Sequence, residues 1–256
     1  MKKLWITCTL SLITFGMSLQ AQTVEEILTN YFENTGGLEN WQQLEGIHGY
    51  GKGRQGGQEF PGQMVQLKNG KQMQKYSVQG KEFFQGVFDG ETLWSTNFLN
   101  MKAEKSSSEE TANFKLEAND FPDSFLNWKE KGYTVELMGT ESMEGTDTYK
   151  IKLVKEPVTV DGEQVDDISF YYFDTENYVP IAMETEIKSG PAKGKTVKVV
   201  MSDYQEVDGL YFAFSTTQYL GEQPMLSIQM DSLQLNPKVD DSLFAFPETI
   251  TEGDEK

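Results

Sequence analysis

The feature that most constrains the fold of this chain is a period-two alternation of apolar and polar residues that recurs along much of its length. Tyr149, Ile151 and Leu153 alternate with lysines, and the same alternation runs through residues 181–188 and 197–202. Because successive side chains of a strand point to opposite faces of a sheet, this pattern predicts half-buried antiparallel strands. Aromatic residues at 12% and 23 glycines also favour β structure over a helical bundle.

Turn signals separate the strand segments, which indicates hairpin connections. They are Lys68-Asn69-Gly70, Asp89-Gly90, Glu144-Gly145, Asp161-Gly162 and Asp208-Gly209. The strand segments lie near Ile47, Val65, Met73, Phe84, Leu93, Val135, Ile151, Phe170, Met183, Val199, Phe214 and Ile228. Short strands at even spacing predict one large curved sheet or barrel. No internal repeat or linker divides the chain, so we expect residues 22–256 to form a single domain.

Two helices are predicted before the strands, and two more between an N-terminal and a C-terminal group of strands. The capping box Thr23-Val24-Glu25-Glu26 begins a helix that ends at Gly36-Gly37, and residues 38–44 form a short second helix. A second capping box begins at Ser107 and leads to a helix through residue 116. Residues 122–128, with a proline in the first turn, predict one more short helix.

The first 21 residues have the pattern of a secretory signal peptide. Lys2 and Lys3 precede the uncharged, mostly apolar stretch Leu4–Leu19, which is short for a membrane span, and the small Ala21 follows. We expect cleavage after Ala21; a retained anchor helix is the alternative. A lipid-modified N-terminus would need a cysteine at the end of the stretch, whereas Cys8 lies near its start.

Cleavage would leave 235 residues and, because two lysines are lost, would lower the net charge from −18 to −20. Such an acidic chain is a poor partner for nucleic acid, since phosphate binding needs clustered cations. The remaining 235 residues contain no cysteine, so no disulfide can form, and their single histidine is too few for a zinc site. We expect no metal and no cofactor.

His48 is the only histidine and therefore the only candidate for a catalytic triad. No serine or aspartate lies near it at triad-like spacing, and a lone histidine is more often structural or exposed. The adjacent pairs Asp166-Asp167 and Asp240-Asp241 make poor acid–base pairs, because neighbours in a strand point to opposite faces. We expect no catalytic residues.

Several strand segments are apolar on both faces, among them Phe83–Phe88, Ile168–Phe173 and Tyr211–Phe214. Nine methionines also lie beyond residue 21, and thioethers suit adaptable apolar surfaces. One interpretation is a cavity for acyl chains, and the other is a thick ordinary core filled by aromatic residues. Composition alone leaves both open.

Two segments resemble the periplasmic lipoprotein carrier family LolA and the related outer-membrane lipoprotein-sorting proteins. The first, Asp89-Gly90-Glu91-Thr92-Leu93-Trp94 followed by Asn97-Phe98, is similar to the family's Asp-Gly turn and Trp-bearing strand before the lid helices. The second, Asp241-Ser242-Leu243-Phe244-Ala245-Phe246-Pro247, is similar to its closing strand and Phe-rich end. The order of signal peptide, helix, strands, lid helices and further strands also matches.

The resemblance implies an α+β fold, an incomplete antiparallel β-barrel of about eleven strands wrapped over the N-terminal and lid helices. It implies a periplasmic carrier that binds the acyl chains of lipoproteins or other lipids in an apolar cavity and shuttles them towards the outer membrane. Its partners would be the acylated cargo, an inner-membrane releasing transporter and an outer-membrane acceptor. We expect a monomer.

Apolar residues of the central strands and the lid are the candidates for the lipid-binding cavity, although a register slip of one residue would turn a strand's set to the other face. They are Val65, Phe84, Leu93, Trp94, Met101, Phe114, Phe170 and Met183.

One position departs from the family. Its carriers usually have an arginine followed by proline in the strand before the Asp-Gly motif, where this chain has Lys68-Asn69-Gly70. Arg54 lies one strand earlier. The departure leaves open whether a lid latch exists and whether a transporter loads the protein. The alternative function is an envelope binding or sensing module on the same fold, which recognises a partner protein without lipid transport.

Overall fold

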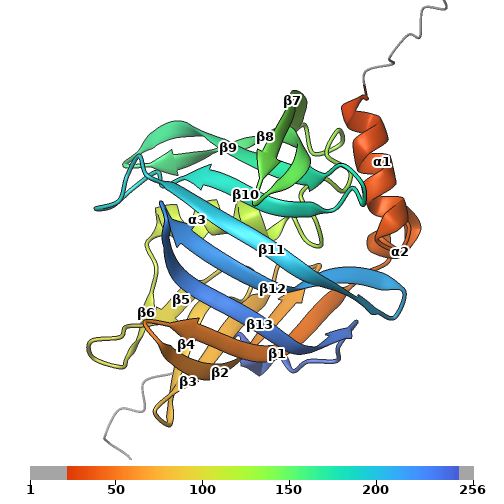
Figure 1. Ribbon diagram of the computed structural model, residues 1–256. Helices are drawn as coiled ribbons and strands as arrows, with labels where there is room; N and C mark the ends of the chain where they lie inside the picture. Colours follow the sequence, from red (N-terminus) through yellow and green to blue (C-terminus); the bar gives the residue numbers. More distant parts are fainter. Residues whose placement is uncertain (1–21, 248–256) are drawn as a thin grey trace, which may run out of the picture.

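In a computed structural model, which describes residues 22–247, the chain forms one antiparallel sheet of 13 strands (Figure 1). The strands are β1 (Gly46–Gln55), β2 (Gln58–Leu67), β3 (Gln72–Val78), β4 (Lys81–Phe88), β5 (Leu93–Thr96), β6 (Ala103–Lys105), β7 (Thr134–Met143), β8 (Thr146–Val160), β9 (Glu163–Asp174), β10 (Pro180–Glu186), β11 (Thr196–Val207), β12 (Leu210–Leu220) and β13 (Gln223–Leu235). The predicted signal peptide lies outside the described residues.

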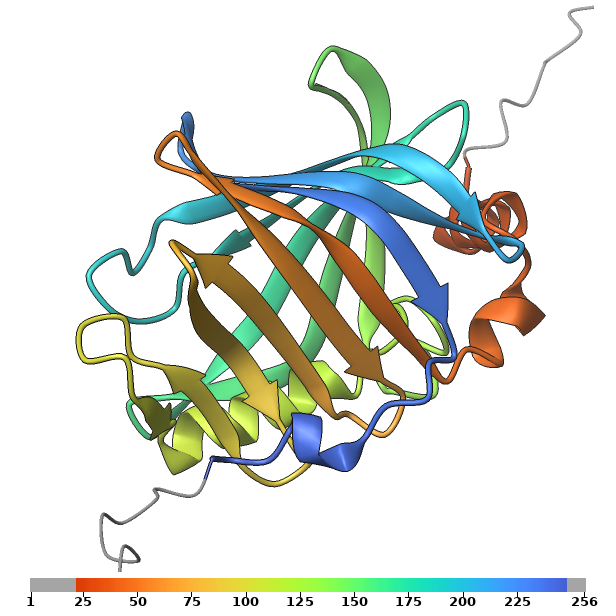
Figure 2. The same ribbon diagram turned by 90° about the horizontal axis from the view of Figure 1, so that it is seen from below.

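The sheet consists of two meanders joined by one long-range pairing. Its order is β6-β5-β4-β3-β2-β1-β13-β12-β11-β10-β9-β8-β7, so β1 pairs with β13 and every other neighbour is consecutive in sequence. The β1–β13 register runs from Ile47 opposite Leu235 to Arg54 opposite Ser227. The strands at the two ends of this order, β6 and β7, do not pair with each other, so the sheet is open. The sheet is also strongly curved (Figure 2).

The predicted count of about eleven strands was too low. All twelve predicted segments lie in strands, and the additional strand is β6. It has only three residues, Ala103–Lys105, which is too short to show a period-two pattern.

The predicted turns form, and their backbone explains the tight hairpins. At Glu144-Gly145, Asp161-Gly162 and Asp208-Gly209 both residues have positive φ, between 48° and 87°. Two consecutive residues of this kind make the type I′ turn, whose twist matches that of the flanking strands. The β7–β8, β8–β9 and β11–β12 connections therefore follow directly from local sequence.

Within residues 22–247, three α-helices and a 3₁₀ turn accompany the sheet: α1 (Val24–Asn34), α2 (Leu38–Gln42), α3 (Ser108–Ala118) and η1 (Asp241–Leu243). Both predicted capping boxes are present, at Thr23 and at Ser107. Among the described residues, no helix combines the length and the apolar character needed to cross a bilayer.

Two further predictions were wrong. Residues 121–132 form successive turns instead of a helix, because the Asp123 carboxylate accepts the Phe125 N–H at 2.7 Å and Asn127 has a φ of +54°. The C-terminal motif forms η1 rather than a closing strand, because the Asp240 side chain accepts the Ser242 N–H at 2.8 Å and so begins a tight turn.

The main core lies where α1 and α2 pack against the sheet. Its aromatic residues meet at close range; the ring centroids of Tyr31 and Phe173 are 5.5 Å apart. The buried members of this core are Val24, Ile27, Leu28, Tyr31, Phe32, Trp41, Leu44, Phe125, Leu126, Val135, Ile151, Leu153, Phe173 and Leu210. The apolar residues of α1 thus lie on one face of the helix, and that face is buried against β7–β9.

A second core lies on the other face of the sheet, beneath residues 239–246, which we call the C-terminal cover. Phe244 is fully buried there among Val65, Met73, Val87 and Trp94. The Trp94 indole N–H donates to the Phe244 carbonyl at 3.1 Å. The cover therefore shields the apolar outer face of β2–β5 from water.

We predict that Phe244→Ala destabilises the protein by about 3–5 kcal/mol, because it leaves a cavity in a fully packed site. Chemical denaturation would measure the change. The matched control is Leu99→Ala, since Leu99 is 96% exposed and its truncation should change stability by less than about 0.5 kcal/mol. Equal effects of the two substitutions would show that the C-terminal cover is not part of the folded core.

The buried carboxylate of Asp123 generates a second prediction. It accepts a hydrogen bond from the Tyr31 hydroxyl at 2.9 Å and one from the Phe125 N–H, which ties α1 to residues 121–132. Burial raises the pKa of Asp123, and these hydrogen bonds and the charge of Lys131 offset the rise only in part. The folded state therefore binds a proton more tightly than the unfolded state does.

Because the pKa is raised on folding, stability is lost as pH rises from the unfolded value, about 3.9, to the folded value. We predict that the unfolding free energy of the wild type, relative to that of Asp123→Asn, decreases over this range and is constant above it. Denaturant titrations at several pH values measure this difference. The contributions of the other carboxylates cancel in it, because both proteins contain them. A difference that rises with pH would contradict the prediction.

Candidate functional site

Helix α3 identifies the concave side of the sheet. Its Phe114 and Ala118 pack against Phe88 of β4 and Leu93 of β5. At its other side, Asn113 exchanges two hydrogen bonds with the Thr159 backbone of β8, at 2.7 and 2.9 Å. The helix thus spans the two arms of the curved sheet (Figure 2). Because Phe88 and Leu93 pack against this helix, side chains on their face of the sheet point inward.

An apolar surface covers the inward face of the central strands, and we call it the methionine face. Strand register places its members on one face of β2, β13, β11 and β10; for example, Met183 lies opposite Val199, and Met201 lies opposite Thr216, which pairs with Ile228. Between them, β1 contributes glycines and β12 contributes Thr216 and Gln218. All of its members are partly exposed: Met64, Met183, Val199, Met201, Ile228 and Met230.

Glycines of β1 and β2 let bulky side chains lie flat beside this surface. A Cβ atom at Gly49 would come within 2.1 Å of the Met230 methyl group, and one at Gly53 within 2.3 Å of the Phe60 ring. The hollow lined by Met64, Met230 and their neighbours measures about 50 Å³, room for about two water molecules. An acyl chain would therefore lie along the open methionine face or displace its flexible thioethers.

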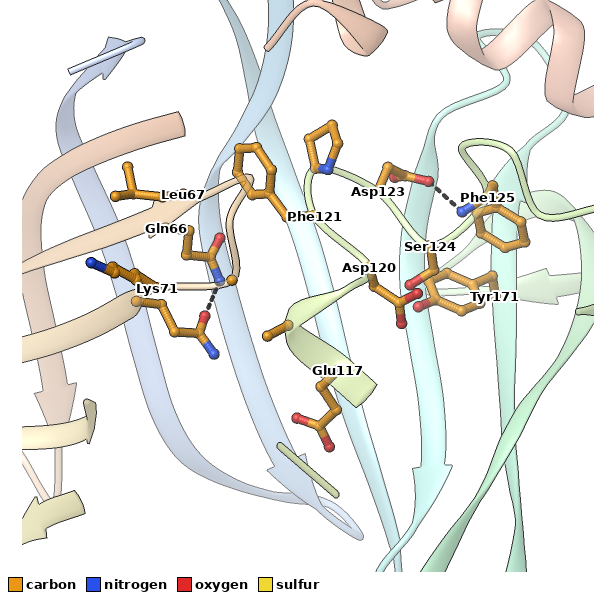
Figure 3. A pocket seen from close by; sticks show the side chains of 14 residues that line it. Gln66, Leu67, Lys71, Glu117, Asp120, Phe121, Asp123, Ser124, Phe125 and Tyr171 are labelled. Carbon is orange, nitrogen blue, oxygen red and sulfur yellow. Dashed lines mark hydrogen bonds between the residues drawn. The ribbon is translucent and has the colours of Figure 1, made fainter. Parts of the chain in front are cut away.

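Beyond the methionine face the concave side becomes polar. The inward positions change from Leu153 to Lys155 on β8, from Tyr171 to Ser169 on β9 and from Met183 to Thr185 on β10. All of these residues except Leu153 line a hollow of about 560 Å³, which we call the polar cavity. A neighbouring hollow of about 240 Å³ shares six of its wall residues (Figure 3): Gln66, Gln72, Glu117, Asp120, Ser124 and Tyr171.

An ion-pair network forms one wall of the polar cavity. The Lys155 ammonium lies 2.9 Å from Asp120 and 3.2 Å from Asp167, and Lys188 forms a second ion pair with Asp167. Burial disfavours the charge on Asp167, but both lysines outweigh it and lower its pKa. Burial likewise disfavours the Lys155 ammonium, yet the two carboxylates raise its pKa above the usual value. These pKa shifts favour the charged forms of Lys155 and Asp167.

The predicted cavity residues do not come together at one site. Val65, Phe84 and Trp94 belong to the core beneath the C-terminal cover, on the outer face. Phe170 also faces outward, where the Lys150 ammonium lies 5.2 Å from its ring centroid. Met183 belongs to the methionine face.

The other three predicted residues lie near α3 or beyond it. Leu93 and Phe114 belong to the small core under α3, together with Phe88 and Ala118. Met101 lies in the β5–β6 loop with a φ of +61°. In the same loop Phe98 is 64% exposed and Leu99 is 96% exposed.

Sequence reasoning did not single out Met64, Met201, Ile228 and Met230 as cavity residues. A signal was present in the alternating glycines of β1, which leave one face of that strand without side chains. Which face that is depends on the β1–β13 pairing, and no local pattern specifies a contact between residues so far apart in sequence.

Lys68, which stands where the resemblance predicts an arginine, contacts the end of α2. The Lys68 ammonium lies 2.7 Å from the Glu45 carboxylate and donates to the Gln42 carbonyl at 3.1 Å. Lys68 therefore joins the β2–β3 turn to the end of α2. His48, on the outer face, lies 2.9 Å from the Gln63 side-chain oxygen and stacks on Tyr50.

Comparison with known proteins adds evidence about the fold. No family model and no curated protein sequence matches this chain. Among solved structures, it is similar to a domain from Vibrio parahaemolyticus described as an outer membrane lipoprotein-sorting protein domain, with 13% identity, a TM-score of 0.53 and coverage of 86% of this chain and 94% of that one. It is also similar to a LolA superfamily protein from Nitrosomonas europaea, with 14% identity, a TM-score of 0.50 and coverage of 88% and 98%. The chain therefore has the LolA-like fold, an open, mostly β structure with a few helices.

Proposed function

We propose that this protein is an envelope carrier that holds acyl chains of lipoproteins or other lipids against the methionine face. The observation that supports it most is that this inward surface is apolar and partly exposed, with no described segment packed over it. An ordinary core would be filled at this position. The LolA-like fold is consistent with this use, although a fold by itself does not determine function.

The physical need for a carrier is large. Each methylene moved from a membrane into water costs about 0.8 kcal/mol, so a long acyl chain leaves a membrane only at a cost of about 10 kcal/mol or more. Contact with Met64, Met201 and Met230 would recover much of this cost. Because unbranched thioether side chains adapt their shape, such a surface can accept chains of different length and leave them again.

We propose that the protein acts in the periplasm. Residues 1–21 would direct export and be removed, and residues 22–256 would act in the periplasm as one lipid-binding domain. The strong negative charge would keep the protein from adhering to anionic membrane surfaces. Its partners would be acylated cargo, a transporter that releases it and an outer-membrane acceptor.

A charged residue on the methionine face should weaken acyl binding. We predict that Met201→Glu weakens binding of a fluorescent fatty acid such as cis-parinaric acid at least about tenfold, because a carboxylate would have to be desolvated against the chain. Fluorescence titration measures the dissociation constant. The control is Met138→Glu, since Met138 is 54% exposed and lies on β7, outside the methionine face. Equal affinities of the two folded variants would contradict the proposal.

A partner-recognition function has support from one surface feature. The apolar tip Phe98-Leu99 is held in a fixed shape, because Phe98 stacks on Phe83 at 4.8 Å and the Asn97 side chain accepts the Leu99 N–H at 2.8 Å. An exposed apolar group in a fixed loop often marks a contact with another molecule. Residues of this kind suit a binding or sensing module as well as a carrier.

A photo-crosslinking residue at position 99 separates the two functions. In the intact envelope, the carrier proposal predicts crosslinks to many acylated lipoproteins or to lipid. Crosslinks to one unmodified protein would favour the recognition module.

A further inference from the structure

The polar cavity and the methionine face form one continuous surface. Met183 belongs to both, and on β2 the inward residue next to Met64 is Gln66 of the cavity wall. Inward positions two residues apart on a strand are separated by about 7 Å. A single ligand could therefore place a chain on the methionine face and a polar group in the cavity.

The charges of the cavity determine what polar group fits. Its walls have four acidic residues, Glu117, Asp120, Asp167 and Glu186, and two lysines, Lys155 and Lys188. Both lysines are engaged with Asp120 or Asp167. An anionic group would have to compete with these carboxylates for the lysines, and it would meet an excess of negative charge.

Glu117 stands apart from the network. It lies in the last turn of α3, is exposed to solvent and lines the cavity (Figure 3), and no ion pair or side-chain hydrogen bond holds it among residues 22–247. The cavity is also lined by the side-chain amides of Gln66 and Gln72, and the Gln66 amide N–H donates to the Gln72 oxygen at 3.0 Å. The cavity thus presents one carboxylate without a partner beside amides that can orient a polar group.

We propose that the polar cavity binds the positively charged head group of an amphiphilic ligand, with Glu117 as its ionic partner. The inference rests on the proposed function, because the acyl chain of the same ligand would occupy the methionine face. A primary ammonium group suits the site, since its three N–H donors match the carboxylate and amide acceptors that line the cavity. Desolvation raises the pKa of Glu117 above the usual glutamate value, so a higher pH favours the carboxylate form that the ion pair needs.

The test compares three lipids with one identical acyl chain. Lysophosphatidylethanolamine has a terminal ammonium group, lysophosphatidylglycerol has a diol in its place, and a monoacylglycerol has neither phosphate nor amine. Binding to the protein without residues 1–21 is measured by native mass spectrometry and fluorescence displacement. We expect the ethanolamine lipid to bind about tenfold more tightly than the glycerol lipid, the size of effect of one hydrogen bond to a charged group.

Variants identify the carboxylate. Glu117→Gln should remove the tenfold preference and leave the affinity for the monoacylglycerol unchanged. Glu117→Lys should reverse the preference towards the glycerol lipid, which keeps the test valid if one variant folds poorly. Glu176→Gln, in the exposed β9–β10 turn, makes the same change of charge outside the cavity and should have no effect.

The possible failures are distinguishable. If none of the three lipids binds, the proposed function itself fails. If all three bind and Glu117→Gln changes none of the affinities, the inference is overturned and the carrier proposal stands. Tighter binding of the glycerol lipid by the wild type would also overturn it, because the cavity would then prefer an anion.

Discussion

The pairing of β1 with β13 is the contact on which the rest of the structure depends. It joins two meanders that would otherwise be separate sheets, and it sets the face that each central strand turns inward. A shift of one residue would turn Met230 outward and Gln229 inward, and the methionine face would be lost. Because the paired segments are about 180 residues apart in sequence, their register is fixed by packing rather than by a turn.

The two faces of the sheet are used differently. On the outer face of β2–β5, the C-terminal cover buries Trp94 and its neighbours. On the inner face, α1 and α2 fill the end formed by β7–β9, and α3 covers Phe88 and Leu93 and bonds to the Thr159 backbone of β8. The remaining inner surface changes from apolar, at the methionine face, to polar, at the polar cavity. That gradient matches an amphiphile better than it matches a purely apolar cargo.

Local patterns predicted much of this architecture. The period-two segments located twelve strands, Asp161-Gly162 and similar pairs located the hairpins, and the capping boxes at Thr23 and Ser107 located two helices. Each depends on neighbours within a few residues. The turns at residues 121–132 were mistaken for a helix because the Asp123 side chain competes for backbone N–H groups there. The inward residues could not be chosen from sequence. Phe83 and Phe84 are both apolar, and only tertiary packing sends Phe83 inward and Phe84 towards the C-terminal cover.

Whether acyl chains occupy the methionine face in the cell is the central question. The direct measurement is native mass spectrometry of the protein purified from its own envelope, followed by extraction and identification of what it holds. Our account predicts a bound acylated molecule that is lost on extraction with organic solvent. A protein that is recovered without acylated cargo under every condition would contradict it.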